Sequence, residues 1–270
     1  MIFNIAGNGN RFGNMPEFTY TGRYRLLNDG KVDNVQNWRI KLLTSGVLTF
    51  TKIGTNIDVF CVGGGGGGAA GGGGGGGGYT KTSKNITATR NKQYTITIGS
   101  GGSAGVDTDS DDDTEHNGGD GGRTSAFSIY ANGGKGGIWQ NGMTGTYGGA
   151  GGSGGGGFGA GNGGSNGGDG GQARSGYPGG SGQRNNTREF GESNGTLYSG
   201  GGGGGNYSEW AYTGGSGGAG GGGDAHRAYT DPGHPGTDNT GGGGGGSIKS
   251  SGNYNAGKGG TGIVVIRNTR

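Results

Sequence analysis

Apolar and polar positions alternate in only a few short stretches of this chain. The alternation runs through residues 47–53, 57–62 and 94–98 (VLTFTKI, IDVFCV and YTITI) and predicts three β-strands. Residues 124–131 and 262–267 are two further strand candidates, and the second is the most β-prone stretch of the chain. No helix is predicted anywhere.

Turn residues indicate how these strands are joined. Residues 54–56 predict a hairpin between the first two strands, and residues 90–92 predict another that leads into 94–98. The final strand is expected to close a sheet that begins near Val47, which would make residues 37–270 one domain. Residues 1–36 differ in composition and are predicted to be an N-terminal attachment or oligomerisation segment. A strand or arm of the same domain is the alternative.

Glycine tracts fill most of the remaining chain, and glycine supplies 84 of the 270 residues. The segments between tracts are too short to fold alone, so the tracts are not linkers. Their phase is informative, because NGGDGGR (117–123), NGGKGGI (132–138) and NGGDGGQ (166–172) place a side chain at every third position. A period of three is that of the polyproline II helix, which rises about 3.1 Å per residue.

This period predicts a bundle of polyglycine II helices. Edges without Cβ atoms allow close backbone approach, so that N–H and C=O groups can pair between neighbouring helices. All-glycine runs such as 63–78 should be central, and Gly-Gly-X runs should be peripheral with X facing outward. The predicted fold class is therefore all-β with a polyglycine II bundle or sandwich and essentially no α-helix. Disorder of the tracts is the alternative. A disordered region, however, would show neither the three-residue spacing of its side chains nor a β-strand at the end of the chain.

Composition and charge narrow the function. Apolar residues make up 26% of the chain, which is too little for a side-chain core of this length. A net charge of +3 with mixed signs gives no case for nucleic acid or an anionic membrane as a partner, and no membrane insertion is expected. The start lacks a signal peptide, so synthesis in the cytoplasm of the producing cell is expected. Cys61 is expected to be a buried structural thiol.

No enzymatic constellation is evident. His116, His226 and His234 lie in polar segments and are predicted to be solvated, and no nucleophile motif accompanies them. We therefore expect a protein that is not an enzyme and has no cofactor. The acidic stretch 107–120 has oxygen ligands at EF-hand spacing from Asp109 to Asp120 but lacks the glycine and the helices, so a solvated loop is favoured over a calcium site.

Recognition is expected from the segments between tracts, at 138–147, 174–178, 206–213 and 224–240. Their aromatic and basic side chains suit flat sugar rings or a protein loop. The alternative for each aromatic residue is that it caps the glycine bundle. The candidate binding residues are Trp139, Tyr147, Arg174, Tyr177, Tyr207, Trp210, Tyr212, Arg227 and Tyr229.

The order of these elements resembles the glycine-rich domain of phage and prophage tail proteins. The resemblance covers residues 37–270 and includes the glycine run after IDVFCV, the segment GGRTSAFSIYANGGKGG and the final GIVVIR. The architecture is also similar to polyglycine II tail-fibre tips. The resemblance implies a virion adhesin at the fibre tip that binds a bacterial surface receptor, either a glycan or an outer protein loop. Other tail-fibre or baseplate proteins and a homo-oligomer such as a trimer are the implied partners. A structural glycine-rich extracellular fibre or matrix protein is the alternative.

Overall fold

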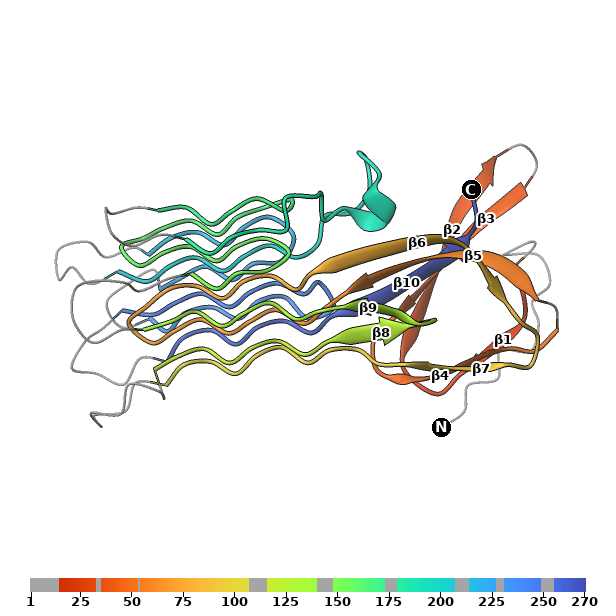
Figure 1. The fold of residues 1–270 in the computed structure, drawn as a ribbon, viewed down its shortest axis with the longest axis horizontal. Coiled ribbons are helices and arrows are strands. Elements are labelled where there is room, and N and C mark those ends of the chain that lie inside the picture. The colour runs from red at the N-terminus through yellow and green to blue at the C-terminus, as the bar shows by residue number, and fades with distance from the viewer. Residues whose placement is uncertain are drawn as a thin grey trace.

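The computed structural model describes residues 15–32, 35–52, 54–106, 116–139, 148–172, 179–206, 214–226, 231–248 and 255–270. The described chain is all-β, with one short 3-10 turn, η1 (Glu189–Gly191), and no α-helix. It is elongated, with the strands at one end and the glycine tracts at the other (Figure 1). We call the tract region the glycine bundle, its end beside the strands proximal and its free end distal.

The strands form two larger antiparallel sheets and one short hairpin. The five-stranded sheet has the order β2-β3-β10-β5-β6, the three-stranded sheet has the order β1-β4-β7, and β8 pairs with β9. The bounds are β1 Phe18–Tyr20, β2 Tyr24–Val32, β3 Val35–Leu42, β4 Gly46–Phe50, β5 Thr55–Val62, β6 Thr80–Ala88, β7 Gln93–Ile96, β8 Thr124–Ala126, β9 Ile129–Ala131 and β10 Ile263–Asn268.

The two central strands of the larger sheet, β5 and β10, are buried on both faces. Alternate residues, among them Val59, Cys61 and Val264, face the main core together with the three-stranded sheet. The residues between them, such as Phe60 and Val265, face a second cluster on the opposite side of the sheet. Burial on both faces explains why these strands are continuous apolar runs. It also confirms Cys61 as a buried thiol.

The second face is covered by residues 184–199, which we call the strap. The strap leaves the bundle, contains η1, and packs Phe190 and Tyr198 against Phe60 at ring-centroid distances of 5.9 and 5.5 Å. Its buried Glu189 pairs with Arg39 and lies 3.3 Å from the Lys41 ammonium. The strap is thus joined to the sheet by both apolar contacts and ion pairs.

The strands form where the sequence predicts them, but both predicted hairpins are wrong. β4 and β5 lie in different sheets, as do β6 and β7, so the chain passes from one sheet to the other between Phe50 and Thr55 and between Ala88 and Gln93. The turn at 90–91 is present, with Asn91 at φ +58°. Residues 124–131 form two strands, because Phe127 and Ser128 adopt positive φ and reverse the chain between β8 and β9.

The C-terminal strand closes a sheet, but not the one that contains Val47. β10 pairs with β5 and β3 at the centre of the five-stranded sheet, whereas Val47 lies on β4 in the three-stranded one. Two strands lie within the first 36 residues: β1 pairs with β4, and β2 pairs with β3. An attachment or oligomerisation role for residues 1–36 stays a prediction.

Hydrogen bonds in the glycine bundle repeat every three residues. The amides of Gly64, Gly67 and Ala70 donate to the carbonyls of Gly122, Gly119 and His116, stepping by three along two antiparallel segments. The intervening residues donate to other neighbours in the same way. Segment 63–70 thereby bonds to six surrounding segments, which are 72–79, 102–105, 116–122, 134–137, 244–247 and 257–260. This is the period that the sequence predicts; a polyglycine II assignment in the strict sense of helix parameters stays a prediction.

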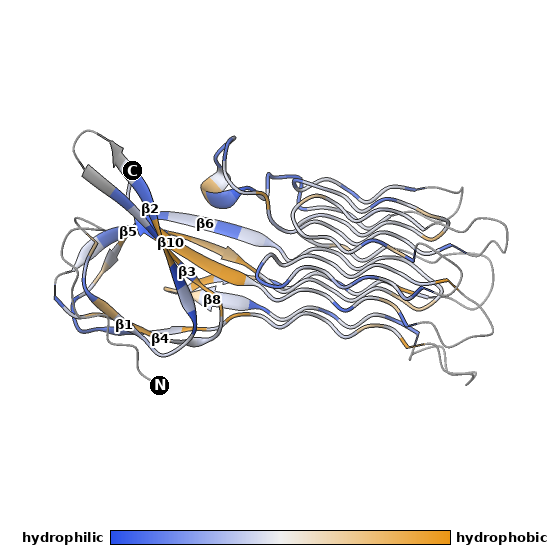
Figure 2. Ribbon diagram, turned by 180° about the vertical axis from the view of Figure 1, so that it is seen from behind, coloured by the Kyte–Doolittle hydropathy of each residue, from blue (hydrophilic) through white to orange (hydrophobic). Residues whose placement is uncertain are grey.

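Runs rich in consecutive glycine occupy the interior of the bundle. Every residue from 63 to 78 is buried. Five segments each bond to six neighbours, namely 63–70, 72–79, 153–158, 199–206 and 241–248. Figure 2 shows the bundle with little apolar colour, in contrast to the central strands of the sheet. Backbone hydrogen bonding, rather than burial of apolar side chains, therefore holds the bundle together.

Glycine is sterically required in this interior. A Cβ atom on Gly67 would lie 1.8 Å from the Ser103 carbonyl oxygen, and one on Gly64 would lie 1.9 Å from that of Ser100. These atoms belong to neighbouring backbones, which cannot move aside alone. The missing side chains are thus what allows the segments to approach to hydrogen-bonding distance.

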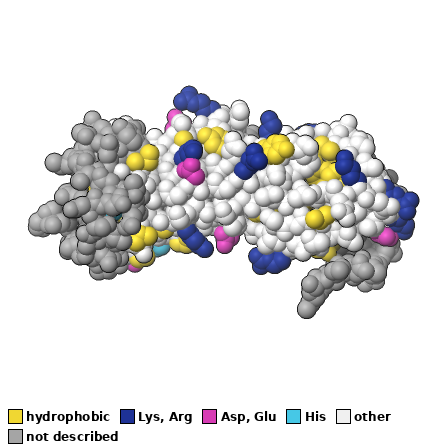
Figure 3. Space-filling model, turned by 60° about the horizontal axis from the view of Figure 1, so that its bottom comes forward, with side chains coloured by type: hydrophobic (Ala, Val, Ile, Leu, Met, Phe, Trp, Pro, Cys, Tyr) yellow, Lys and Arg dark blue, Asp and Glu magenta, His cyan; other side chains and the backbone are white. Residues whose placement is uncertain are grey.

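Gly-Gly-X segments lie at the periphery with X facing outward, as predicted. Asn132, Lys135 and Ile138 are exposed while the glycines between them are buried or half-buried, and Asn166, Asp169 and Gln172 are exposed too. Figure 3 shows single charged side chains projecting from a surface that is otherwise mostly backbone and small or polar residues. Ser153 is an exception, because it is fully buried and accepts a hydrogen bond from Gly167.

The outward side chains also cap backbone groups, a role that the sequence pattern does not reveal. An N–H that points away from the bundle has no neighbouring segment, so it needs another acceptor. Asp120 accepts from Gly136 N–H at 3.0 Å, and Asn162 accepts from Ser216 N–H at 3.0 Å. The same pattern recurs in Asn117–Trp139, Ser165–Ala219, Asp169–Gly182, Asp224–Gly217 and Asp238–Thr261. This explains why X is so often asparagine, aspartate or serine.

Candidate functional site at the distal end of the bundle

The distal end of the bundle gathers boundary residues from six separate parts of the chain. Six intervals of the chain are flanked by described residues that lie at this end. The flanking residues are 106 and 116, 139 and 148, 172 and 179, 206 and 214, 226 and 231, and 248 and 255. Residues on both sides of these intervals belong to the bundle, since Gly105 bonds to Gly68, His116 to Ala70 and Gly205 to Gly72. A rigid hydrogen-bonded frame thus fixes where each connecting segment starts and finishes.

Trp139 is the one predicted receptor-binding residue that the structure describes. Its ring stacks on His116 at a centroid distance of 4.3 Å, and each residue is only 7% exposed. Its backbone N–H donates to Asn117 at 2.7 Å. In this position Trp139 covers the end of the bundle. This is the alternative role predicted for the aromatic residues, that of capping the glycine bundle. Receptor contact by Trp139 stays a prediction.

The other eight predicted residues lie outside the described residues. They belong to the distal connections 140–147, 173–178, 207–213 and 227–230. They are Tyr147, Arg174, Tyr177, Tyr207, Trp210, Tyr212, Arg227 and Tyr229. Their chain neighbours that are described all lie at the distal end.

The predicted solvation of the histidines is wrong for two of the three. His116 is buried against Trp139, and His226 is fully buried. Neither ring nitrogen of His226 has a hydrogen-bond partner in the described part of the chain. Burial lowers the pKa of His226 below its usual value, although the charge of Asp231 acts in the opposite direction. The polar flanks of these histidines concealed their place in the last layer of the bundle.

Acidification should therefore loosen the distal end through His226. In the unfolded chain a histidine titrates near pH 6.5, and in the folded chain its pKa is lower, so the unfolded state binds more protons as the pH falls below about 6.5. The stability that neutral His226 supports is complete above that pH and is lost below it. We expect the melting temperature to fall between pH 7.5 and 5 more steeply for the wild type than for His226→Leu, measured by circular dichroism. Parallel curves would contradict this.

Two positions of the acidic stretch 107–120 are already engaged. Asn117 accepts from Trp139, and Asp120 binds Lys135 at 2.6 Å as well as Gly136 N–H. Partial burial opposes ionisation of Asp120, but these hydrogen bonds and the Lys135 charge lower its pKa overall. Residues 107–115 lie outside the described residues, and no group of three metal-ligating residues occurs among those described. Two of the residues that fit the EF-hand spacing, Asn117 and Asp120, therefore already accept hydrogen bonds from backbone N–H groups of the bundle.

Comparison with known proteins shows the family of this chain. A family model described as a glycine-rich domain matches residues 44–269, from just before β4 to the last strand. The match thus covers most of both sheets and the whole bundle. No curated protein matches the chain. None of the described helical turns is long or apolar enough to cross a membrane.

Proposed function

The chain belongs to the glycine-rich domain family, and we propose that it is a phage or prophage tail-fibre adhesin that binds a bacterial surface receptor at its distal end. One observation carries this proposal: six connections of four to nine residues all begin and finish on the distal layer of a rigid bundle. The described turns at the proximal end, such as 166–167 and 219–221, are tight. Apart from the strap, the longer and more varied connections therefore start and finish at the distal end.

The chemistry of these connections supports recognition. They hold six of the chain's twelve tyrosines in about one seventh of its length, and they also include Trp210. Tyrosine and tryptophan offer large rigid contact areas with polar tips at low entropic cost, so they are enriched where proteins bind partners. One connection, 107–115, is instead strongly acidic. The connections differ from one another, whereas a purely structural fibre would call for regular ones.

A frame of this kind suits adhesion because it separates stability from recognition. The bundle interior is held by backbone hydrogen bonds between described segments such as 63–70 and 72–79. Substitutions in the connections can then change the receptor without affecting the interior. In the tail fibre, the two sheets at the opposite end would face the remaining fibre or baseplate proteins.

The proposal predicts that receptor binding depends on the distal connections. We expect fluorescently labelled protein to bind some strains in a panel of bacteria and not others, as measured by flow cytometry. Replacing 140–147 or 207–213 with unrelated segments of equal length should lower binding to the preferred strain at least tenfold. The swaps spare Ile138, Trp139 and Asn206, which belong to the bundle.

Lys84→Ala is the matched control, because Lys84 is exposed on β6 far from the distal end. It should bind like the wild type, and all variants should melt at similar temperatures. Equal binding to every strain that neither swap changes would contradict the adhesin proposal and favour a structural fibre or matrix protein.

A further inference from the structure

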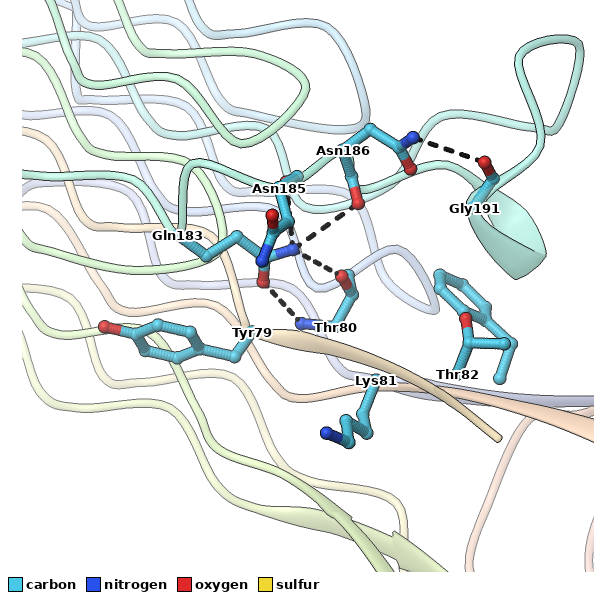
Figure 4. Close-up of a pocket in the computed structure, with 9 residues that line it drawn as sticks. Tyr79, Thr80, Lys81, Thr82, Gln183, Asn185, Asn186 and Gly191 are labelled. Carbon is cyan, nitrogen blue, oxygen red and sulfur yellow. Dashed lines mark hydrogen bonds between the residues drawn. The ribbon is translucent and has the colours of Figure 1, made fainter. Parts of the chain in front are cut away.

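A polar groove runs along the free edge of β6, beside the start of the strap (Figure 4). Its volume is about 560 Å³, within the usual size range of small-molecule sites. The lining combines amides, hydroxyls, one cation and two aromatic residues, and contains no carboxylate. The lining residues are Phe60, Tyr79, Thr80, Lys81, Thr82, Gln183, Asn185, Asn186 and Gly191.

One wall of the groove is fixed by Gln183. Its Oε1 accepts the Thr80 N–H at 3.0 Å, and its Nε2 donates to Thr80 Oγ1 at 2.8 Å and to the Asn185 carbonyl at 3.1 Å. Asn186 Nδ2 donates to the Gly191 carbonyl at 3.2 Å. Both amides are thus oriented before any ligand arrives, which lowers the entropic cost of binding.

The floor is equally rigid. Phe60 is 1% exposed and is held between Phe190 and Tyr198 of the strap. The half-buried Tyr79 lies at the bundle side of the groove, where its ring points away from the amide wall (Figure 4). The groove therefore depends on three parts of the fold meeting at one place, namely strands β5 and β6 of the larger sheet, the strap and the bundle.

Other polar groups of the lining remain available. The side chains of Asn185, Lys81 and Thr82 form no hydrogen bond or ion pair with any other described residue. Asn185 and Lys81 are exposed, and Thr82 is half-buried. They supply an amide with two donors and an acceptor, an ammonium and a hydroxyl.

We propose that this groove is a saccharide-binding site, separate from the distal end. Sugar hydroxyls both donate and accept, so they match amides and hydroxyls better than they match a purely charged or apolar lining. Lys81 lies at the margin of the groove, where its side chain points away from the amide wall (Figure 4).

Other ligand classes fit less well. A phosphate ligand normally requires several cations or converging N–H groups, and the groove has one lysine. An extended peptide could pair with an edge strand, but Gln183 already occupies the Thr80 N–H. The register irregularity opposite Ile57 and Val59, together with Asn85 at φ +55°, also interrupts the edge of β6.

The full chain should be tested on an array of purified bacterial O-antigen, capsular and teichoic-acid glycans, with affinities of positive glycans measured by isothermal titration calorimetry. We expect at least one glycan to bind, and Asn185→Ala to weaken it at least tenfold. Asn194→Ala is the control, since Asn194 is an exposed asparagine of the same strap outside the groove. It should bind like the wild type.

Amide hydrogen exchange gives a second measurement that does not rely on a variant. The glycan should protect residues 80–82 and 185–186. Glycan binding should also survive the distal swaps of 140–147 and 207–213, so that failure of the adhesin proposal does not affect this one. The absence of glycan binding, binding unaffected by Asn185→Ala, or binding of peptides in place of glycans would each overturn the proposal.

Discussion

Gly67→Ala should destabilise the protein by about 3 kcal/mol, at the upper end of the cost of overfilling a packed interior. The new Cβ would lie 1.8 Å from the Ser103 carbonyl oxygen and 3.3 Å from the Ala104 nitrogen, both in a neighbouring segment. Separating the two segments would also strain the bonds that Gly67 makes with Gly119 and Gly137. At about 2 to 4 °C per kcal/mol for a chain of this size, the melting temperature should fall by about 6 to 12 °C in a calorimetric scan.

Gly168→Ala is the control for this effect. It is also a glycine of a bundle segment, but it is exposed, and its Cβ would meet only the Ser165 carbonyl oxygen, at 3.1 Å. Its effect should stay within about 0.5 kcal/mol, as for other surface substitutions. If both variants melted like the wild type, the claim that glycine is required by close backbone approach would be wrong.

Gly67 belongs to an interior segment and Gly168 to a peripheral one, and the sequence pattern predicts this difference. Three-residue spacing in 132–138 and 166–172 is a local signal, and it correctly separates peripheral segments from interior ones. The capping role of Asp120 or Asn162 depends on which segments are neighbours, as does the burial of Ser153. Neighbours in this lattice come from all parts of the chain, so no local pattern encodes them.

The same limit applies to the sheets and to the candidate sites. Alternation located the strands, but turn residues report only that the chain reverses, so both predicted hairpins paired strands that lie in different sheets. No local pattern predicts the strap, because Glu189 meets Arg39 across 150 positions of sequence. The groove beside it likewise joins Thr80 to Gln183, 103 positions apart. Residue type alone predicts Trp139 as a site residue, whereas its described contacts place it at the bundle end against His116.

Arg267→Met should be as damaging as a core cavity, with a loss of about 3 to 5 kcal/mol. The Arg267 side chain is 3% exposed, its Nε lies 3.1 Å from Asp58 Oδ2, and its guanidinium lies 3.9 Å from the centroid of the Phe190 ring. Asp58 is fully buried on β5, so removal of the arginine leaves a carboxylate without its counter-charge. Glu192 of the strap also loses its partner at 2.7 Å. Urea denaturation followed by circular dichroism measures the loss.

The double variant Arg267→Met/Asp58→Asn separates two contributions to the free energy of unfolding. One is the cost of leaving the buried Asp58 carboxylate unpaired, and the other is the stabilisation by the ion pair itself. An asparagine keeps an oxygen that can accept the Asn85 N–H, which donates to Asp58 Oδ1 at 3.0 Å, but it carries no charge. One guanidinium nitrogen of Arg267 has no partner among the described residues, so the arginine itself is imperfectly satisfied. We therefore expect the double variant to recover more than half of the lost stability. A double variant as unstable as Arg267→Met alone would show instead that the guanidinium's packing under the strap, and not the buried charge of Asp58, holds this face of the sheet together.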